Sequence, residues 1–356
     1  MRVTLFLCAL RIRQREGLSI NSKKPLTYSD AGVDIDRGNQ AVKKIAQLAR
    51  TTYRPEVRSG VGGFAGSFQL SPNQTLLAGT DGVGSKLLIA QALARYDTVG
   101  IDLVAMNVND VLASGGEPLL FLDYLAVGYL DPERVATLVA GVVEGCNQAG
   151  CALLGGETAE LPDIYGQNGY DLAGFVVGRL AYDPPTAQPG DHIIGIASSG
   201  FHSNGYALIR AVIDRAGLDL RGRYPETGSR TLGEILLEPT RIYVRPIMDL
   251  WAQPVVRAMA HITGGGLLEN LGRTLPEGMG AELAKSAWER SPVFNWFQRL
   301  GEVDDAEMYR TFNMGIGFTV VVAPDDVSQT IAHFSQYSLR AYDIGRVVDH
   351  PGVSLR

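Results

Sequence analysis

A glycine-containing turn near residue 80 carries the first side chains that could handle phosphate. The segment Asp81-Gly82-Val83-Gly84-Ser85-Lys86 follows an apolar run that ends at Thr80. Glycines let backbone N–H groups approach an anion closely, Lys86 could add a positive charge, and Asp81 could ligate Mg²⁺. The spacing is not that of a Walker A loop, and no GxGxxG follows an early strand. From these residues alone, a phosphate site and a plain turn are both open.

Several acidic side chains lie in the first half of the chain, beside glycine turns or on polar helix edges. Mg²⁺ prefers a few carboxylates together with water and nucleotide phosphates. Carboxylates held together without basic partners repel one another unless a cation lies between them. A magnesium site and a set of scattered surface acids would both explain the group, which comprises Asp81, Asp102, Asp110 and Glu157, with Asn109 as a neutral oxygen donor.

Two loops in the second half combine glycines with polar side chains. In the segment 198–205, the side chains of His202, Ser203 and Asn204 precede a predicted helix, where an anionic or sugar group could bind. The run Thr263-Gly264-Gly265-Gly266 is typical of a second anion-binding turn. Helix capping for the first loop, a hinge for the second and a structural role for His261 are the alternatives.

Alternating helices and strands must position these loops. Apolar periodicity, an Asp131 cap followed by Pro132, and a helix stop at Gly150 indicate α/β or α+β architecture rather than an all-β fold. Three prolines within 181–190 predict a domain boundary there. The expected helices span 36–52, 98–114, 132–149 and 206–216, and the expected strands span 75–80, 121–127, 152–154, 172–177 and 191–197.

Composition excludes several classes of protein. The 356 residues carry a net charge of −6, so we expect no nucleic-acid partner. No apolar run approaches the length of a membrane span, so we expect no membrane partner. The three cysteines, Cys8, Cys146 and Cys151, lack metal-site spacing and predict neither a zinc site nor a disulfide framework. Residues 1–27 are basic and fit no element, so we expect a disordered extension.

Taken together, the motifs are highly specific, and the chain from Tyr28 to its end resembles the phosphoribosylformylglycinamidine cyclo-ligase (aminoimidazole ribonucleotide synthetase) family. Ser85 stands where threonine is expected, which keeps the hydroxyl, and Asn107 and Met314 stand where cysteine is frequent. The resemblance rests on segments 28–36, 79–86, 100–110, 155–160, 199–206, 238–244, 261–266 and 307–315.

The resemblance implies an enzyme that closes the imidazole ring in purine biosynthesis. Its substrate would be formylglycinamidine ribonucleotide, its cofactors ATP and Mg²⁺, and its reaction would proceed through an iminophosphate with release of ADP and phosphate. It implies a cytoplasmic homodimer, in which N-terminal sheet domains (28–182) pair across the dimer and C-terminal α/β sandwich domains (183–356) bind substrate.

The same resemblance implies roles for individual residues. The catalytic residues would be His202, Lys86 and Asp110, with His202 as the first candidate for proton transfer. The metal ligands would be Asp81, Asp110 and Glu157. ATP would contact Gly82, Gly84, Ser85, Lys86, Asn109, Gly155 and Gly156, and the substrate would contact His202, Ser203, Asn204, Thr263, Gly264, Gly265 and Gly266.

Two alternatives differ in their products. A related ATP-dependent phosphotransferase would release ADP without an imidazole. A nucleotide-binding regulator that has lost turnover would bind ATP and release nothing. Intact Lys86, Asp110 and Glu157 favour an active enzyme over the regulator.

Overall fold

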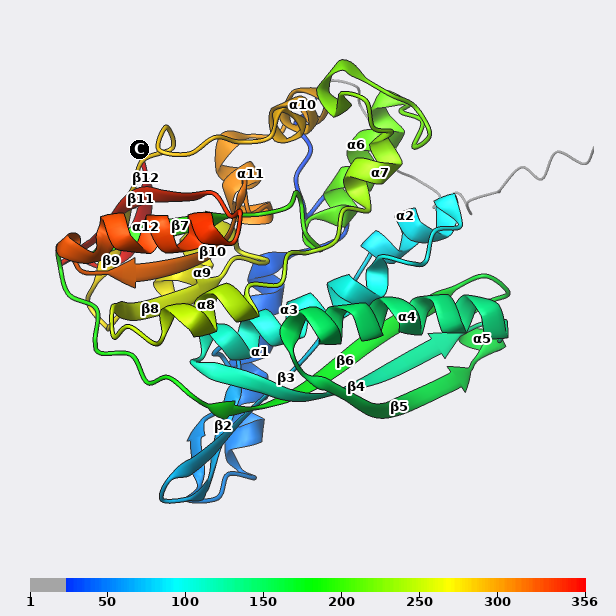
Figure 1. The fold of residues 1–356 in the computed structure, drawn as a ribbon. Coiled ribbons are helices and arrows are strands. Elements are labelled where there is room, and N and C mark those ends of the chain that lie inside the picture. Colours follow the sequence, from blue (N-terminus) through cyan, green and yellow to red (C-terminus); the bar gives the residue numbers. More distant parts are fainter. Residues whose placement is uncertain (1–23) are drawn as a thin grey trace, which may run out of the picture.

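The computed structural model describes residues 24–356, which build two six-stranded sheets joined by the segment 181–191 (Figure 1). We predicted disorder for residues 1–27, of which residues 1–23 lie outside the described part of the chain. Residues 24–27 are described, and the Leu26 amide donates to the carbonyl of Gly301, 3.0 Å away.

The first sheet has the strand order β1-β2-β3-β6-β4-β5 and is antiparallel except between β4 and β5. Its strands are β1 (Val57–Ser59), β2 (Gly66–Ser71), β3 (Gln74–Gly82), β4 (Gly116–Val127), β5 (Ala152–Glu160) and β6 (Tyr170–Leu180). The predicted strands are confirmed, but β5 continues through Gly155, Gly156 and Glu157, which the sequence indicated as a turn. The reason is close packing: a Cβ on Gly156 would lie 2.1 Å from the Asp123 carbonyl oxygen of β4.

The second sheet has the order β12-β9-β11-β7-β10-β8, with only β9 and β12 parallel. All residues of β10 are buried, and all of them except Thr319 are apolar. Its strands are β7 (His192–Ala197), β8 (Val256–His261), β9 (Gly280–Leu283), β10 (Ile316–Val322), β11 (Ala341–Val348) and β12 (Gly352–Leu355).

Helices cover one face of the first sheet and surround the second. Those of the N-terminal half are α1 (Ile35–Arg50), α2 (Lys86–Leu93), α3 (Val99–Ala113), α4 (Pro132–Ala149) and α5 (Pro162–Tyr165). The C-terminal half contains α6 (Tyr206–Ala216), α7 (Leu232–Leu236), α8 (Val244–Leu250), α9 (Gly266–Gly272), α10 (Pro292–Gly301), α11 (Asp305–Thr311) and α12 (Val327–Gln336), with two 3₁₀ turns, η1 (Pro225–Thr227) and η2 (Pro324–Asp326). No helix within residues 24–356 is long and apolar enough to cross a bilayer.

Helix α3 lies between the two halves of the molecule (Figure 1). One side packs on β3, β4 and β6, and another contacts β8 and α8 of the C-terminal half. This double contact explains why α3 is apolar nearly all round and why even Asp102 and Asn109 are fully buried. Residue 102 lies about two turns from residues 109 and 110, so α3 presents them along one side.

Helix α1 carries an apolar stripe that does not pack into the core. It forms where expected, with Asp34 accepting from the Arg37 amide at its N-terminus, but none of its residues is buried. The apolar side chains of Val42, Ile45 and Leu48 are 40%, 51% and 72% exposed. Its polar contacts lead instead to the C-terminal half, where Arg310 pairs with Asp36 and Glu269 accepts from Asn39.

The face of the first sheet opposite α3 and α4 carries exposed apolar side chains. Strand burial alternates along β6, where Leu172, Gly174 and Val176 are buried and Phe175 is 41% exposed. Register places Phe175 beside Leu122 of β4, and Tyr124 lies on the same face. We call this surface the open face, defined by Leu76, Ala78, Leu122, Tyr124, Phe175 and Val177.

Candidate active site

The first group of functional side chains lies where β3, α3 and β8 meet. Asp81 stands near the end of β3, Asp110 in the last turn of α3, and His261 at the end of β8. Nδ1 of His261 lies 2.7 Å from Oδ1 of Asp110, while its Nε2 is buried without a hydrogen-bond partner. The carboxylate fixes the imidazole with a proton on Nδ1 and leaves the Nε2 lone pair available.

Asp81 is held in an unfavourable setting for a charge. Burial first, and then the negative charge of Asp110, raise the pKa of Asp81 to about 6, although its carboxylate accepts from the Gly82 amide at 2.7 Å. A hard cation bound between two such carboxylates would relieve the repulsion between their charges. Within residues 24–356, no three His, Cys, Asp or Glu side chains group as a metal site, so this pair would form only part of a coordination sphere.

Glu157 is not brought to this pair. In the aligned rows of the sheet, Gly82 pairs with Ala173, Ala173 with Tyr124, and Tyr124 with Glu157. Three strand spacings place Glu157 about 14 Å from Gly82. Glu157 also shares the open face with Tyr124, whereas Asp81 lies in the neighbouring row, which faces the helices. The predicted metal triad is therefore divided within one chain.

The predicted ATP residues are divided in the same way. Gly82 ends β3, and Gly84 and Ser85 lie in the turn that leads to α2, where Gly84 has a φ of +73°. Gly155 and Gly156 lie on exposed strand β5 at the far edge of the sheet.

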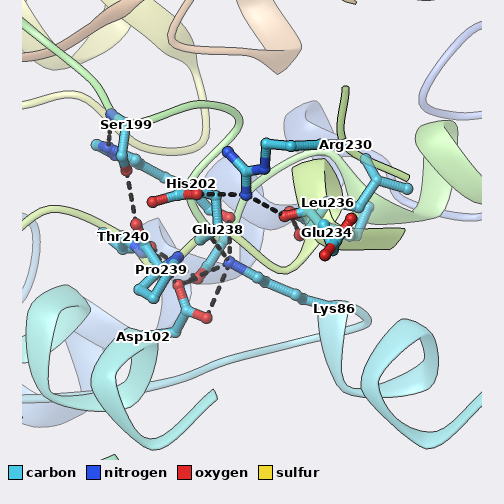
Figure 2. Close-up of polar contacts among 12 residues, drawn as sticks. Lys86, Asp102, Ser199, His202, Arg230, Glu234, Leu236, Glu238, Pro239 and Thr240 are labelled. Carbon is cyan, nitrogen blue, oxygen red and sulfur yellow. Dashed lines mark hydrogen bonds and ion pairs between the residues drawn. The ribbon is translucent and has the colours of Figure 1, made fainter. Parts of the chain in front are cut away.

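Lys86 and Asp102 form a second group, buried between the two halves of the chain (Figure 2). The ammonium of Lys86 lies 2.8 Å from Asp102 and also donates to the carbonyl oxygens of Glu238 at 2.7 Å and His202 at 3.1 Å. Both side chains are 0% exposed. Burial lowers the pKa of Lys86, and the charge of Asp102 opposes that change. All three N–H groups of the ammonium have protein acceptors, so contact with an ATP phosphate would require one of them to be released.

The Asp102 carboxylate organises the loops that face it. Its Oδ1 accepts from the Thr240 amide at 2.7 Å, from the Thr240 hydroxyl at 2.6 Å and from the Ser203 hydroxyl at 3.0 Å. Asn109 makes similar contacts further along α3. Its Oδ1 accepts from the Tyr243 amide, and its Nδ2 donates to the Arg241 carbonyl. These contacts tie Ser203 and Asn109 to neighbouring segments of the chain, and their expected contacts with substrate and ATP stay predictions.

His202 is buried in a left-handed backbone conformation with a φ of +60°. Its Nε2 accepts from the Ser199 amide at 3.2 Å, so the neutral ring carries its proton on Nδ1, which is buried without a partner. Burial lowers the pKa of His202 well below its usual value, with further contributions from His261, Lys86 and Arg241. The lowered pKa favours the neutral imidazole, whose Nδ1–H is a hydrogen-bond donor that no described residue accepts.

The two predicted substrate loops come together. A Cβ on Gly264 would lie 3.9 Å from the Asn204 side-chain nitrogen, and the Asn204 Oδ1 is buried without a partner. Nδ2 of Asn270 fixes the second loop by donating toward the carbonyls of Thr263, Gly264 and Gly266. Gly265 and Gly266 have φ values of +93° and +62°, which favour glycine.

Three features of the site escaped sequence reasoning. The sequence leaves a structural role and a catalytic role for His261 both open, although a histidine that ends a buried strand before three glycines is an available signal. Asn107 was noted only as a substitution, yet its Oδ1 is buried without a partner beside Asp81, whose carbonyl accepts from its Nδ2. A groove of about 1090 Å³ has no local sequence signature, because its lining comes from α1, the glycine loop 60–63, the open face near Thr80, and α9.

Comparison with known proteins gives a consistent result. Residues 62–180 match the AIR synthase related protein N-terminal domain, and residues 188–356 match the AIR synthase related protein C-terminal domain. The chain is similar to the phosphoribosylformylglycinamidine cyclo-ligases of Nitrosospira multiformis (51% identity, covering 91% of this chain and 93% of the relative) and Desulfitobacterium hafniense (52% identity, covering 90% and 96%).

Solved structures share the fold at lower identity. The protein tt0281 from Thermus thermophilus superposes with a TM-score of 0.61 at 25% identity, covering 87% of this chain and 94% of that one. The thiamine-monophosphate kinase ThiL complexed with AMPPCP and TMP has a TM-score of 0.61 at 18% identity and covers 87% and 91%. With half of its residues shared with cyclo-ligases across nine-tenths of its length, the chain belongs to the phosphoribosylformylglycinamidine cyclo-ligase (AIR synthase) family.

Proposed function

We propose that this chain catalyses ATP-dependent ring closure of formylglycinamidine ribonucleotide to 5-aminoimidazole ribonucleotide, with release of ADP and phosphate. The observation that carries this proposal is about 50% identity to cyclo-ligases along nearly the whole chain. The paired carboxylates, the oriented His261 and the two adjoining polar loops support it, because each provides a function that the reaction needs.

The chemistry divides into two steps. The formyl oxygen attacks the γ-phosphorus of ATP, the bond to ADP breaks, the formamide nitrogen loses its proton, and an iminophosphate forms. An amidine nitrogen then attacks the activated carbon, loses a proton, and the C–O bond to phosphate breaks. Phosphoryl transfer depends mainly on positioning and charge neutralisation, and the second step needs a base at the attacking nitrogen.

His261 supplies that base in our proposal. Its Nδ1 is held by Asp110, so Nε2 is the acceptor that can take the amidine proton. His202 keeps a place in the site as a neutral donor through Nδ1, with its ring held by the Ser199 amide. Asp110 thus remains a catalytic residue, and His202 takes a different role from the proton carrier that the sequence suggested.

ATP and Mg²⁺ are assigned to the neighbourhood of Asp81. The repulsion between Asp81 and Asp110 fits a divalent cation, which would neutralise phosphate charge during transfer. Gly82, Gly84 and Ser85 would offer backbone N–H groups to the phosphates. The loops containing Asn204 and Gly264 would hold the substrate phosphate and ribose.

A homodimer is part of the same proposal. In the N-terminal half, helices cover one face of the sheet and the open face exposes apolar side chains. The open face of a second copy would cover them. Gly155, Gly156 and Glu157 lie at the edge of this face. Pairing of two sheets would therefore bring them into a setting that one chain does not provide.

A coupled assay tests the function directly. Purified protein receives formylglycinamidine ribonucleotide, ATP and Mg²⁺, and both ADP and the diazo-coupled colour of the imidazole product are followed. Equal amounts of the two products are expected. ADP without imidazole would identify a related phosphotransferase, and ATP binding without either product would identify the regulator.

The metal assignment needs a separate experiment. Asp110→Asn and Glu157→Gln are each titrated with Mg²⁺ at saturating ATP, with Asp163→Asn on α5 as an exposed acidic control. We expect Asp110→Asn to raise strongly the Mg²⁺ concentration that half-maximal activity requires. Asp163→Asn should leave that concentration unchanged. The three-residue assignment is wrong if Glu157→Gln has the same Mg²⁺ dependence as the control.

A further inference from the structure

Helix α4 ends in a turn that brings two cysteines together. Gly150 follows the helix in the left-handed conformation with a φ of +74°, and the Cys151 amide donates back to the Cys146 carbonyl, 3.1 Å away. This is the six-residue hydrogen bond of a Schellman turn, in which a side chain of the last helical turn contacts the second one beyond the cap. Here both of those contacting positions are cysteines.

The two thiols occupy different environments. Cys146 is 3% exposed and lies in the core, while Cys151 is half-buried and packs against that core from outside. Both are free thiols, and each shifts the pKa of the other. Their mutual interaction lowers the pKa of Cys151 and raises the pKa of Cys146, so Cys151 is the one that ionises first.

We propose that Cys146 and Cys151 form an oxidisable dithiol that closes to an intrachain disulfide with a low-molecular-weight disulfide such as glutathione disulfide. The turn geometry carries the proposal, because disulfide formation requires two side chains that already meet. The accessible Cys151 is the attacking thiol and the buried Cys146 is the resolving one, as in redox-sensitive pairs.

The exchange balances in two steps. The Cys151 thiolate attacks one sulfur of glutathione disulfide and releases one glutathione thiolate, which leaves a mixed disulfide on Cys151. Cys146 then loses its proton to solvent and attacks the Cys151 sulfur, releasing the second glutathione. The protein loses two electrons and two protons, and the glutathione disulfide is reduced to two thiols.

The bond would join the end of α4 to the start of β5. Cys151 immediately precedes β5, whose first residue is Ala152, and β5 carries Gly155, Gly156 and Glu157. This site is separate from the Asp81–Asp110–His261 group, and the proposal does not depend on the catalytic assignment.

The experiment uses the full chain with Cys8→Ser, which removes the third cysteine. The protein is incubated to equilibrium with excess glutathione disulfide and analysed by intact mass and thiol titration. We expect joint loss of both thiols, a mass decrease of about 2 Da and no retained glutathione. Dithiothreitol should restore both thiols.

Two further variants in the same background assign the roles. Cys146→Ala should stop at a stable mixed disulfide on Cys151, with a mass increase of about 305 Da. Cys151→Ser should stay unreacted while folded, because Cys146 is buried. Three results would overturn the proposal: a persistent glutathione adduct in the Cys8→Ser chain, two thiols left after equilibration, or a disulfide between chains.

Discussion

The Lys86 ammonium and the Asp102 carboxylate lie 2.8 Å apart with neither side chain exposed, at the junction of the two halves of the chain. Lys86 contributes from α2 and Asp102 from α3, and their remaining contacts are to the loops at His202, Glu238 and Thr240. A buried pair of this kind fixes the arrangement of the elements around it, because displacing either partner leaves an uncompensated charge. The loop at 202–204 is therefore positioned by residues of the N-terminal half of the chain.

This relationship predicts a large loss of stability in Lys86→Met. The substitution leaves Asp102 buried and unpaired, so the free energy of unfolding should fall by about 3–5 kcal/mol. Denaturant unfolding measures the change. Lys285→Met, which removes one side of the exposed Lys285–Asp305 pair, should lower it by less than about 1 kcal/mol. Near-normal stability combined with a raised KM for ATP would instead favour direct contact between Lys86 and nucleotide phosphate.

Asp81 predicts a pH-dependent stability in protein free of divalent cations. Its pKa is about 6 in the folded chain against 3.8 for the ordinary group. Between these values the folded state binds more protons than the unfolded state, so stability falls as pH rises through this window. The gain in free energy of unfolding from Asp81→Asn should therefore be larger at pH 7.5 than at pH 4. The two gains should differ by at most about 3 kcal/mol.

Parallel unfolding curves at the two pH values provide the test, with Asp163→Asn as the exposed control. Added Mg²⁺ should remove the difference between the native chain and Asp81→Asn if the cation occupies the carboxylate pair. A pH dependence identical in the native chain and Asp81→Asn would show that Asp81 does not titrate abnormally.

Replacing His261 should selectively lower turnover. His261→Gln keeps a polar side chain but removes the acceptor that Asp110 orients, so kcat should fall by roughly 10²–10⁴-fold. Steady-state kinetics with both substrates measure it. His192→Gln is a matched control, since Nδ1 of His192 also lies 2.8 Å from an aspartate, Asp343, but at the surface. Equal activity in the two variants would remove His261 from the mechanism.

The open face predicts a specific effect on assembly. Leu122→Lys places a charge in the surface that we propose to be covered by a second copy, so the dimer dissociation constant should rise about tenfold or more. Light scattering over a concentration series measures it. Ile164→Lys on α5 should have no effect, because Ile164 is 71% exposed and lies outside the open face. A native chain that is monomeric and fully active would contradict the proposed dimer.

Local sequence signals were sufficient for most elements. Asp131 caps α4, Pro132 occupies its first turn and Gly150 ends it, as the pattern predicted. The same signals failed at β5, where the contact between Gly156 and Asp123 comes from the neighbouring strand. Helix α1 forms where it was predicted but buries none of its residues, because periodicity shows which residues share a helix face and not whether anything packs against that face.

The sequence by itself determined the family, the alternation of helices and strands, and the loops that carry glycine with acidic or polar side chains, because these depend on short segments and their order. Only the tertiary structure decided which of those side chains meet. It joined Asp110 to His261 from residues 151 positions apart, enclosed Lys86 with Asp102, and separated Glu157 from Asp81 by strand order and sheet face. Burial and charge proximity then set the pKa of Asp81 and His202, and both arise from chain segments that are distant in the sequence.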